Sequence, residues 1–282
     1  MNFQVYNKQN QTPETVAAVD ETKGQVLSYK GDIIETYYYS TSYGHTGDYE
    51  AWNLDKDAYG YLQGVWVRSE ENSIDLSDEK SFLDYISNVD SACYESDLKY
   101  FRWNTVLDFQ GKDETLLHTI ADRKEHQPEA ISYYKDASKT ETTDSCSNFG
   151  SLQAINVVKR NQSGVILELE LDFQNGAVSV QSEYNMRAIL GCGITNINLL
   201  DGSSVEMSIL PSAYISIQAK GDGTYAVLGG GYGHGIGMSQ NGAQKLCGQG
   251  FDYKRILNYF YQDTELTELY QPQNTTKEEG GA

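Results

Sequence analysis

Short runs of hydrophobic residues, broken by glycine, asparagine and aspartate, recur along the chain and predict β-hairpins. In the clearest run, Val165, Leu167, Leu169 and Leu171 alternate with largely polar neighbours, as in a half-buried strand. This run leads into Asn175-Gly176, a favoured hairpin dipeptide, and returns as residues 177–181. Three further hairpins are expected over residues 25–39 around Lys30-Gly31-Asp32, residues 197–209 around Asp201-Gly202, and residues 215–228 around Gly221-Asp222-Gly223.

Helices are fewer than strands in this pattern. Between Asp78 and Ser87, three apolar side chains recur at helical spacing. Residues 184–190 form a second helix that Gly191 ends. Two more follow near the end of the chain, where Ser239 caps a helix through residue 246 and Asp252 caps another through residue 261.

These elements predict a mainly β protein with a few helices, of the α+β class, with a strand-rich, barrel-like core. Residues 70–148 are more charged and alternate less, so we interpret them as a mixed, partly helical insertion. It separates a first strand-rich part, residues 1–69, from a second, residues 149–270, which carries the C-terminal helices. Residues 271–282 lack large apolar side chains, and we expect them to be disordered.

Composition narrows the possible functions. Of 282 residues, 39% are hydrophobic and 22% charged, which is typical of a globular chain. The net charge of −19 argues against a surface that binds nucleic acid or anionic lipid, because both need clustered Lys and Arg. No apolar run approaches the roughly 20 residues of a membrane span. Residues 1–20 lack the basic start and apolar stretch of a signal peptide.

Two residue types add detail. The chain has 22 Tyr but only 8 Phe and 3 Trp, and Tyr suits surfaces that bind sugars, peptides or other polar polymers. The four cysteines lie about 50 residues apart, a spacing that excludes a local zinc knuckle or redox pair. Unlinked, mostly buried thiols are favoured over two disulfides. The cysteines are Cys93, Cys146, Cys192 and Cys247.

The densest chemical signal is a glycine-rich segment, Gly229-Gly-Gly-Tyr-Gly-His-Gly-Ile-Gly-Met-Ser-Gln-Asn-Gly-Ala243. Six of its first nine residues are Gly, which lets the backbone adopt positive φ and approach a neighbour or ligand closely. Its spacing fits neither phosphate-binding glycine motif, and no Lys follows. The segment therefore indicates either a polar ligand site or a tight strand-to-helix crossing in which His234 is bonded internally.

A second segment, Tyr37-Tyr-Tyr-Ser-Thr-Ser-Tyr-Gly-His-Thr46, is rich in hydroxyls. Those of Tyr38, Ser40, Ser42 and Thr46, with His45, could surround a sugar, although a polar loop after a strand explains the pattern equally well. No nucleophile elbow exposes Ser42 or Ser239. The four histidines lack paired ligand spacing, so no metal site is predicted.

These segments, in this order, resemble the stage II sporulation protein D family, which includes the amidase enhancers of bacterial cell walls. The glycine-rich segment is similar to that family's Gly-His-Gly-Val-Gly-Met-Ser-Gln-x-Gly-Ala signature, and residues 250–261 to the helix after it. The hydroxyl-rich segment is similar to its Tyr-His-Ser-Thr-Ser-Gly-Gly-x-Thr motif, with Tyr39 and Tyr43 as departures. The resemblance spans about residues 3–268 and includes blocks at residues 22–27, 183–187 and 210–212.

The resemblance implies a lytic transglycosylase that cleaves peptidoglycan between N-acetylmuramic acid and N-acetylglucosamine and leaves 1,6-anhydro ends. One carboxylic acid would protonate the leaving oxygen and then take the proton of the muramic 6-hydroxyl. In the family that acid is a Glu in an upstream block, near a Cys/His cluster that can hold zinc. The chain begins with residues similar to those after that cluster, so we expect the catalytic Glu segment to be absent. Glu35, Glu50, Glu183 and Glu206 are not assigned this role, and Glu183 is expected to pair with Arg187.

Three classes of function remain. The first is a transglycosylase or its substrate-binding part, the second a non-catalytic amidase enhancer that binds peptidoglycan, and the third a structural module without glycan affinity. The partners implied are peptidoglycan glycan strands and other cell-wall hydrolases or sporulation proteins. The expected location is extracytoplasmic, in the wall or between forespore and mother cell, and no cofactor is expected in this chain. We expect a groove where the two motifs meet, with substrate-binding residues Tyr38, Ser40, Ser42, Thr46, His234, Ser239 and Gln240.

Overall fold

The computed structural model describes residues 11–70 and 72–269. These residues form two compact units, one of residues 36–262 and a smaller one in which residues up to 35 join those from 263 onward. The expected disordered tail, residues 271–282, lies outside the described residues. No helix among the described residues is both long enough and apolar enough to cross a membrane.

The smaller unit joins both ends of the described chain in one sheet. Strand β1 (Gln25–Tyr29) pairs antiparallel with β2 (Asp32–Ile33) and with β14 (Glu265–Glu268). The predicted turn is confirmed, since Lys30 and Gly31 both adopt positive φ, as a tight hairpin requires. The second strand is shorter than predicted and ends at Ile33. Helix α1 (Pro13–Glu21), which was not predicted from the sequence, begins at a Thr12 cap.

The larger unit contains a five-stranded sheet whose order, β10-β9-β4-β12-β11, does not follow the chain. Strand β4 (Trp103–Asp108) pairs on one side with β12 (Thr224–Gly229) and on the other with β9 (Ile197–Leu199). The edge strands are β10 (Ser204–Val205) and β11 (Ile215–Ala219). The predicted hairpins around residues 201–202 and 221–223 are therefore present, and β4, from residues 70–148, lies between strands of the later part.

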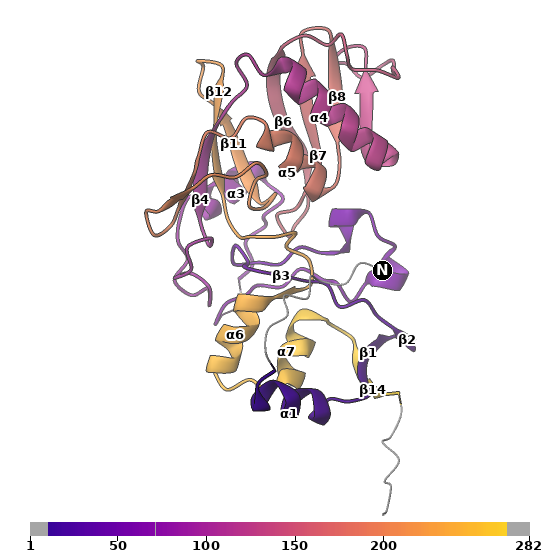
Figure 1. The fold of residues 1–282 in the computed structure, drawn as a ribbon, viewed down its shortest axis with the longest axis vertical. Helices are drawn as coiled ribbons and strands as arrows, with labels where there is room; N and C mark the ends of the chain where they lie inside the picture. Colours follow the sequence, from indigo (N-terminus) through magenta and orange to yellow (C-terminus); the bar gives the residue numbers. More distant parts are fainter. Residues whose placement is uncertain (1–10, 71, 270–282) are drawn as a thin grey trace, which may run out of the picture. The chain divides into compact units, whose positions relative to one another are not determined.

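A four-stranded antiparallel sheet of order β5-β8-β7-β6 completes the framework (Figure 1). Its central hairpin is the one predicted at Asn175-Gly176, although the second strand already begins at Gly176. The bounds of the four strands are β5 (Ile131–Tyr134), β6 (Leu152–Arg160), β7 (Ile166–Phe173) and β8 (Gly176–Val180).

One hydrophobic core connects these two sheets with two helices, α4 (Asp113–His126) and α5 (Glu183–Gly191). Figure 1 shows both helices beside the four-stranded sheet. Helix α4 contributes Leu116 and Ile120 to the core, and α5 contributes Met186, Ile189 and Leu190. The core therefore draws on residues from both the expected insertion and the strand-rich part that follows it.

The predicted helices are confirmed with small changes at their ends. They are α3 (Glu79–Ile86), α5, α6 (Gln240–Gly248) and α7 (Tyr253–Phe260). Ser239 and Asp252 cap α6 and α7 by accepting backbone hydrogen bonds, as expected, and Asp78 caps α3 in the same way. Short helical turns lie at α2 (Lys56–Tyr59), η1 (Tyr49–Trp52) and η2 (Pro128–Ala130).

The α+β class is confirmed, but the barrel-like core is wrong: the sheets formed by the described residues are open, with no closed barrel. Closure requires the first and last strands to pair, whereas β10 and β11 each end the five-stranded sheet at an unpaired edge. The four cysteines are free thiols, of which Cys93 and Cys146 are buried, Cys192 is half-buried and Cys247 is exposed.

Candidate functional site

The hydroxyl-rich and glycine-rich segments lie side by side within the larger unit. Strand β3 (Tyr38–Tyr39) runs parallel to β13 (Met238–Ser239). Farther along, the Thr41 and Tyr232 backbones exchange two hydrogen bonds of 3.1 and 2.8 Å. The Tyr37 carbonyl accepts from the Met238 N–H at 3.0 Å and from the Tyr261 hydroxyl at 2.7 Å. Residues almost 200 positions apart in sequence thus form one junction.

Alternating glycines make this close approach possible. Gly231, Gly233, Gly235 and Gly237 all have positive φ, between 77° and 116°, which L side chains rarely adopt. A Cβ added to Gly237 would lie 2.2 Å from the Tyr37 carbonyl oxygen. The glycines therefore serve both to shape the loop and to let one backbone lie directly against the other.

A buried carboxyl group, Glu95, lies at the centre of the junction. It accepts hydrogen bonds from the Ser42 N–H at 3.0 Å, from the Ser42 hydroxyl, and from the Ser239 hydroxyl at 2.7 Å. Its side chain is fully buried, and burial raises its pKa to about 7 even though these bonds favour the charged form. Glu95 thus joins the two segments, although no sequence motif contains it.

His234 joins the segments at a second point. Its Nδ1 accepts the Ile236 N–H at 3.1 Å, so Nε2 carries the proton and donates to the Tyr38 carbonyl at 2.9 Å. Burial lowers the pKa of His234 to about 4, which keeps the ring neutral. Because both ring nitrogens are hydrogen-bonded, the ring connects the two motifs and does not serve as a free acid or base.

The seven candidate binding residues divide into two groups. Ser42, Thr46 and Ser239 are buried, and their hydroxyls hold backbone or Glu95 atoms within the junction. His45 is buried too, and burial lowers its pKa to about 4. The other four candidates are partly or fully exposed, namely Tyr38, Ser40, His234 and Gln240.

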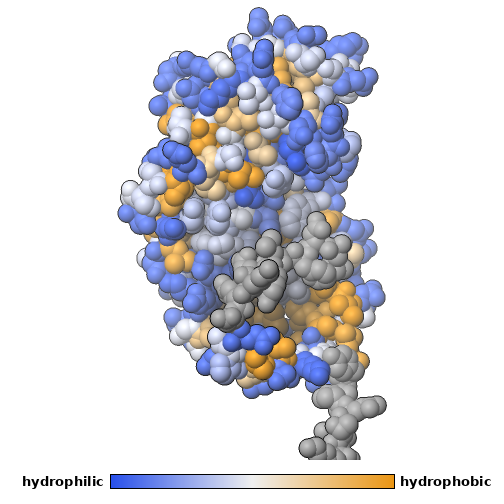
Figure 2. Space-filling view, in the orientation of Figure 1, coloured by the Kyte–Doolittle hydropathy of each residue, from blue (hydrophilic) through white to orange (hydrophobic). Residues whose placement is uncertain are grey.

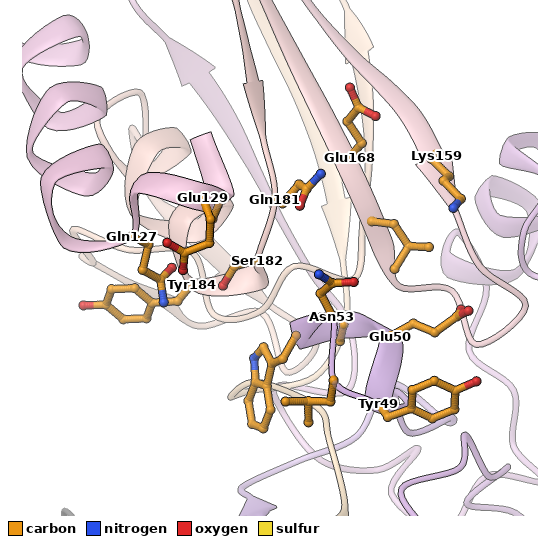
Figure 3. A pocket seen from close by; sticks show the side chains of 15 residues that line it. Tyr49, Glu50, Asn53, Gln127, Glu129, Lys159, Glu168, Gln181, Ser182 and Tyr184 are labelled. Atoms are coloured by element: carbon orange, nitrogen blue, oxygen red, sulfur yellow. The ribbon is translucent and has the colours of Figure 1, made fainter. Parts of the chain in front are cut away.

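A groove of about 800 Å³ lies in the same unit and was not predicted from the sequence (Figure 3). Its walls come from the turn at η1, from the segment around η2, from β6 and β7, and from the start of α5. Figure 3 shows Glu50 and Lys159 on one side and Gln127, Glu129 and Tyr184 on the other. The remaining lining residues are Tyr49, Ala51, Trp52, Asn53, Leu54, Ala130, Leu167, Glu168, Gln181 and Ser182.

The Trp52 indole connects this groove to the motif junction. It lines the groove, and its ring centroid lies 5.1 Å from that of His234 and 5.0 Å from that of Tyr37, edge to face. Such aromatic contacts contribute about 1 kcal/mol beyond burial. Both signature segments therefore support one wall of the groove.

A set of hydrogen bonds holds the same wall to the four-stranded sheet. Asp48, which caps η1, accepts from the Asn161 amide at 2.9 Å and from the Ser163 hydroxyl at 2.7 Å. Burial raises the pKa of Asp48 more than the Ser163 bond lowers it, and the charge of Glu50 raises it further. The Asn161 amide also donates to Glu50 Oε2 at 3.0 Å. The β6–β7 turn and η1 are thus one rigid connection.

The expected ion pair on α5 is confirmed, with Arg187 Nη1 3.0 Å from Glu183 Oε2. Across the described ranges 11–70 and 72–269, no group of three or more His, Cys, Asp or Glu side chains is arranged to hold a metal ion.

Comparison with known proteins defines the class. The chain is 26% identical over 279 residues to the amidase enhancer of Bacillus subtilis (strain 168), a match that covers 94% of this chain and 34% of that protein. It is 36% identical over 76 residues to stage II sporulation protein D of the same organism, covering 27% and 22%. These matches confirm the resemblance to the stage II sporulation protein D and amidase enhancer type. The chain spans about a third or less of the length of these relatives.

A family profile covers most of the larger unit. Residues 44–237 match the family described as "Domain of unknown function (DUF8618)", and the chain belongs to that family. The matched region begins within the hydroxyl-rich segment and ends within the glycine-rich one. The protein is thus similar to both the amidase enhancer and stage II sporulation protein D.

Proposed function

We propose that residues 36–262 bind the glycan strand of bacterial peptidoglycan, outside the cytoplasm, in the groove lined by Trp52. The observation that carries this proposal is the contact of Trp52 with His234 and Tyr37, because it connects both signature segments to one open, polar cavity. Binding sites for polar ligands combine flat aromatic surfaces with a few placed hydrogen-bonding groups.

The groove offers both kinds of group. Trp52, Tyr49 and Tyr184 supply aromatic faces for the apolar side of a sugar ring. Asn53, Gln127 and Gln181 supply amides that can donate to and accept from hydroxyl and acetamido groups. A groove of about 800 Å³ is within the range of known ligand sites and has room for several sugar units.

The burial of Glu95 favours a function in which the motif junction does not itself cleave the glycan. A general acid must come within hydrogen-bond distance of the leaving oxygen, whereas Glu95 is fully buried and bonded to Ser42 and Ser239. We therefore propose glycan binding in the manner of an amidase enhancer as the function of these residues. A transglycosylase reaction remains the second candidate, through the relationship to stage II sporulation protein D.

The test incubates the chain with purified peptidoglycan, followed by pull-down and by mass spectrometry of the soluble products. We expect retention on the glycan, about tenfold weaker for Trp52→Ala, because most of an aromatic contact is lost. Trp52→Phe, which keeps a ring, should retain more binding, and Tyr253→Ala, an exposed aromatic on α7 outside the groove lining, should bind like the wild type.

The outcomes separate the candidates. Retention without anhydro-muramic products supports the binding function, whereas anhydro products show that a carboxyl group of this chain acts as the acid. Absence of retention by a folded wild-type chain would overturn both.

A further inference from the structure

Glu50 is a carboxylate of the groove that is held in place, keeps one oxygen open and, among the described residues, is paired with no cation. Its Oε2 accepts the Asn161 amide at 3.0 Å, and Oε1 makes no hydrogen bond within the described part of the chain. The side chain is exposed and lines the groove. An acceptor with a fixed orientation and a free oxygen can bond a ligand at low entropic cost.

The residue that holds Glu50 is itself immobilised. Asn161 is buried, and its side-chain oxygen accepts the backbone N–H groups of Ser163 at 3.1 Å and Val165 at 3.0 Å. Its amide donates to both oxygens of Asp48 as well as to Glu50. Asn161 therefore cannot rotate without breaking the β6–β7 turn, and Glu50 keeps its position.

The other charged residues of the groove have a different status. Glu168 also has one oxygen without a hydrogen bond among the described residues, but it is half-buried and its Oε1 accepts the Ser179 hydroxyl and the Lys139 ammonium, so a cation of the protein already offsets its charge. Glu129 is exposed and has no hydrogen bond in the described ranges. Lys159 carries the positive charge of the lining on a long, exposed side chain, and no ion pair joins it to Glu50.

We propose that Glu50 is a subsite for an ammonium group, and that the groove therefore prefers glycan strands in which amino sugars carry a free amine rather than an acetamide. This inference rests on the proposed glycan-binding function. A carboxylate attracts an ammonium group through its opposite charge as well as through the hydrogen bond, whereas an acetamide N–H offers only the hydrogen bond. Glucosamine, which N-acetylglucosamine becomes when its acetyl group is removed, presents such an ammonium beside a ring that can stack on Trp52. Trp52 lies in the same turn as Glu50.

The test measures binding of two tetrasaccharides by calorimetry at about pH 6, where an amine is protonated. One is a glucosamine tetramer with free amines, and the other is its fully N-acetylated counterpart. We expect the wild type to bind the free-amine tetramer about tenfold more tightly, because only the amine adds an ion pair with Glu50 to the hydrogen bond.

Two matched variants distinguish binding of the amine at Glu50 from the effect of the overall charge of the groove. Glu50→Gln and Glu129→Gln remove the same charge from the same groove, so they change the overall attraction for a cation equally. Only Glu50→Gln should lower the preference for the free-amine tetramer, because the glutamine oxygen accepts a hydrogen bond but carries no charge. Both variants should still bind the acetylated tetramer. Thermal unfolding confirms that both variants are folded.

Three results would overturn the inference. Equal preferences in the two variants would show that net charge alone selects the amine. A wild type that favours the acetylated tetramer would show that Glu50 does not bind ammonium. If neither tetramer binds while peptidoglycan is retained, the groove is not the site of retention, and loss of peptidoglycan retention as well would overturn the proposed function with it.

Discussion

At the scale of single residues, Glu95 connects the stability of the motif junction to pH. Its pKa is about 7 in the folded chain and ordinarily 4.5, because burial disfavours the charged form. The folded state therefore binds the proton more tightly than the unfolded state. This contribution to stability is fully present below about pH 4.5 and is lost as the pH rises through 7, a change of about 3 kcal/mol.

Glu95→Gln removes this titration while keeping a side chain of the same shape. We expect the wild type to lose stability relative to Glu95→Gln as the pH rises from about 4.5 to 8, measured by urea unfolding of both proteins across that range. Asp97→Asn is the control, because the Lys245 bond lowers the pKa of that exposed carboxyl and reverses the sign of its effect. A difference between wild type and Glu95→Gln that stays constant with pH would refute the assignment.

At the scale of elements, the junction depends on glycines that any side chain would disrupt. Gly237→Ala must place a Cβ at a φ of +77° and 2.2 Å from the Tyr37 carbonyl oxygen, so β3 and β13 would separate. The left-handed backbone alone costs roughly 1–2 kcal/mol, and the clash adds to this. We expect a loss of more than about 2 kcal/mol of unfolding free energy, together with weaker glycan retention.

Gly248→Ala is the matched control in the same part of the chain. Gly248 ends α6, and an added Cβ would meet no heavy atom within 4 Å. Alanine is the better helix former, so this variant should be as stable as the wild type or slightly more so. Equal melting temperatures for the two variants would show that the contact between β3 and β13 is not tight in solution.

The elements that could be predicted from sequence are those with local signals. Ser239 and Asp252 are recognisable as caps, and the hairpin around residues 221–223 is recognisable by its glycines. Helix α4 was missed because Lys112 gives it no side-chain cap, and of its residues only Leu116 and Ile120 are buried. The open sheet could not be deduced either, since β4 pairs with strands about 90 and 120 residues later in the chain.

The site, like the elements, could be predicted from sequence only where a local pattern marks it. Glycine density and hydroxyl patterns identified the two segments, but a hydroxyl looks the same in sequence whether it faces solvent or, like Ser42, a buried carboxyl group. Glu95 lies 53 residues from Ser42 and belongs to no motif. The groove was missed because its walls come from five separated segments, of which only the turn bearing Trp52 and the start of α5 lie close to recognised segments.

At the scale of the whole molecule, the charge of −19 opposes binding to an anionic wall polymer. Figure 2 shows a visible face that is mostly hydrophilic with smaller hydrophobic patches, and the proposed function places the attraction for the polymer in the groove. Repulsion between exposed charges acts over the Debye length, about 10 Å at 0.1 M salt, and falls as salt is added. Stacking and neutral hydrogen bonds in the groove are insensitive to salt.

These two contributions predict opposite salt responses for different ligands. Binding to intact peptidoglycan should strengthen between about 0.05 and 0.3 M NaCl, because long-range repulsion is screened. Binding to the N-acetylated tetramer, which is uncharged, should not change over that range, and binding to the free-amine tetramer should weaken as its contact with Glu50 is screened. Pull-down and calorimetry at each salt concentration measure the three responses. Binding to fully N-acetylated peptidoglycan that weakens with salt would mean that a cationic surface, and not the groove, holds the wall.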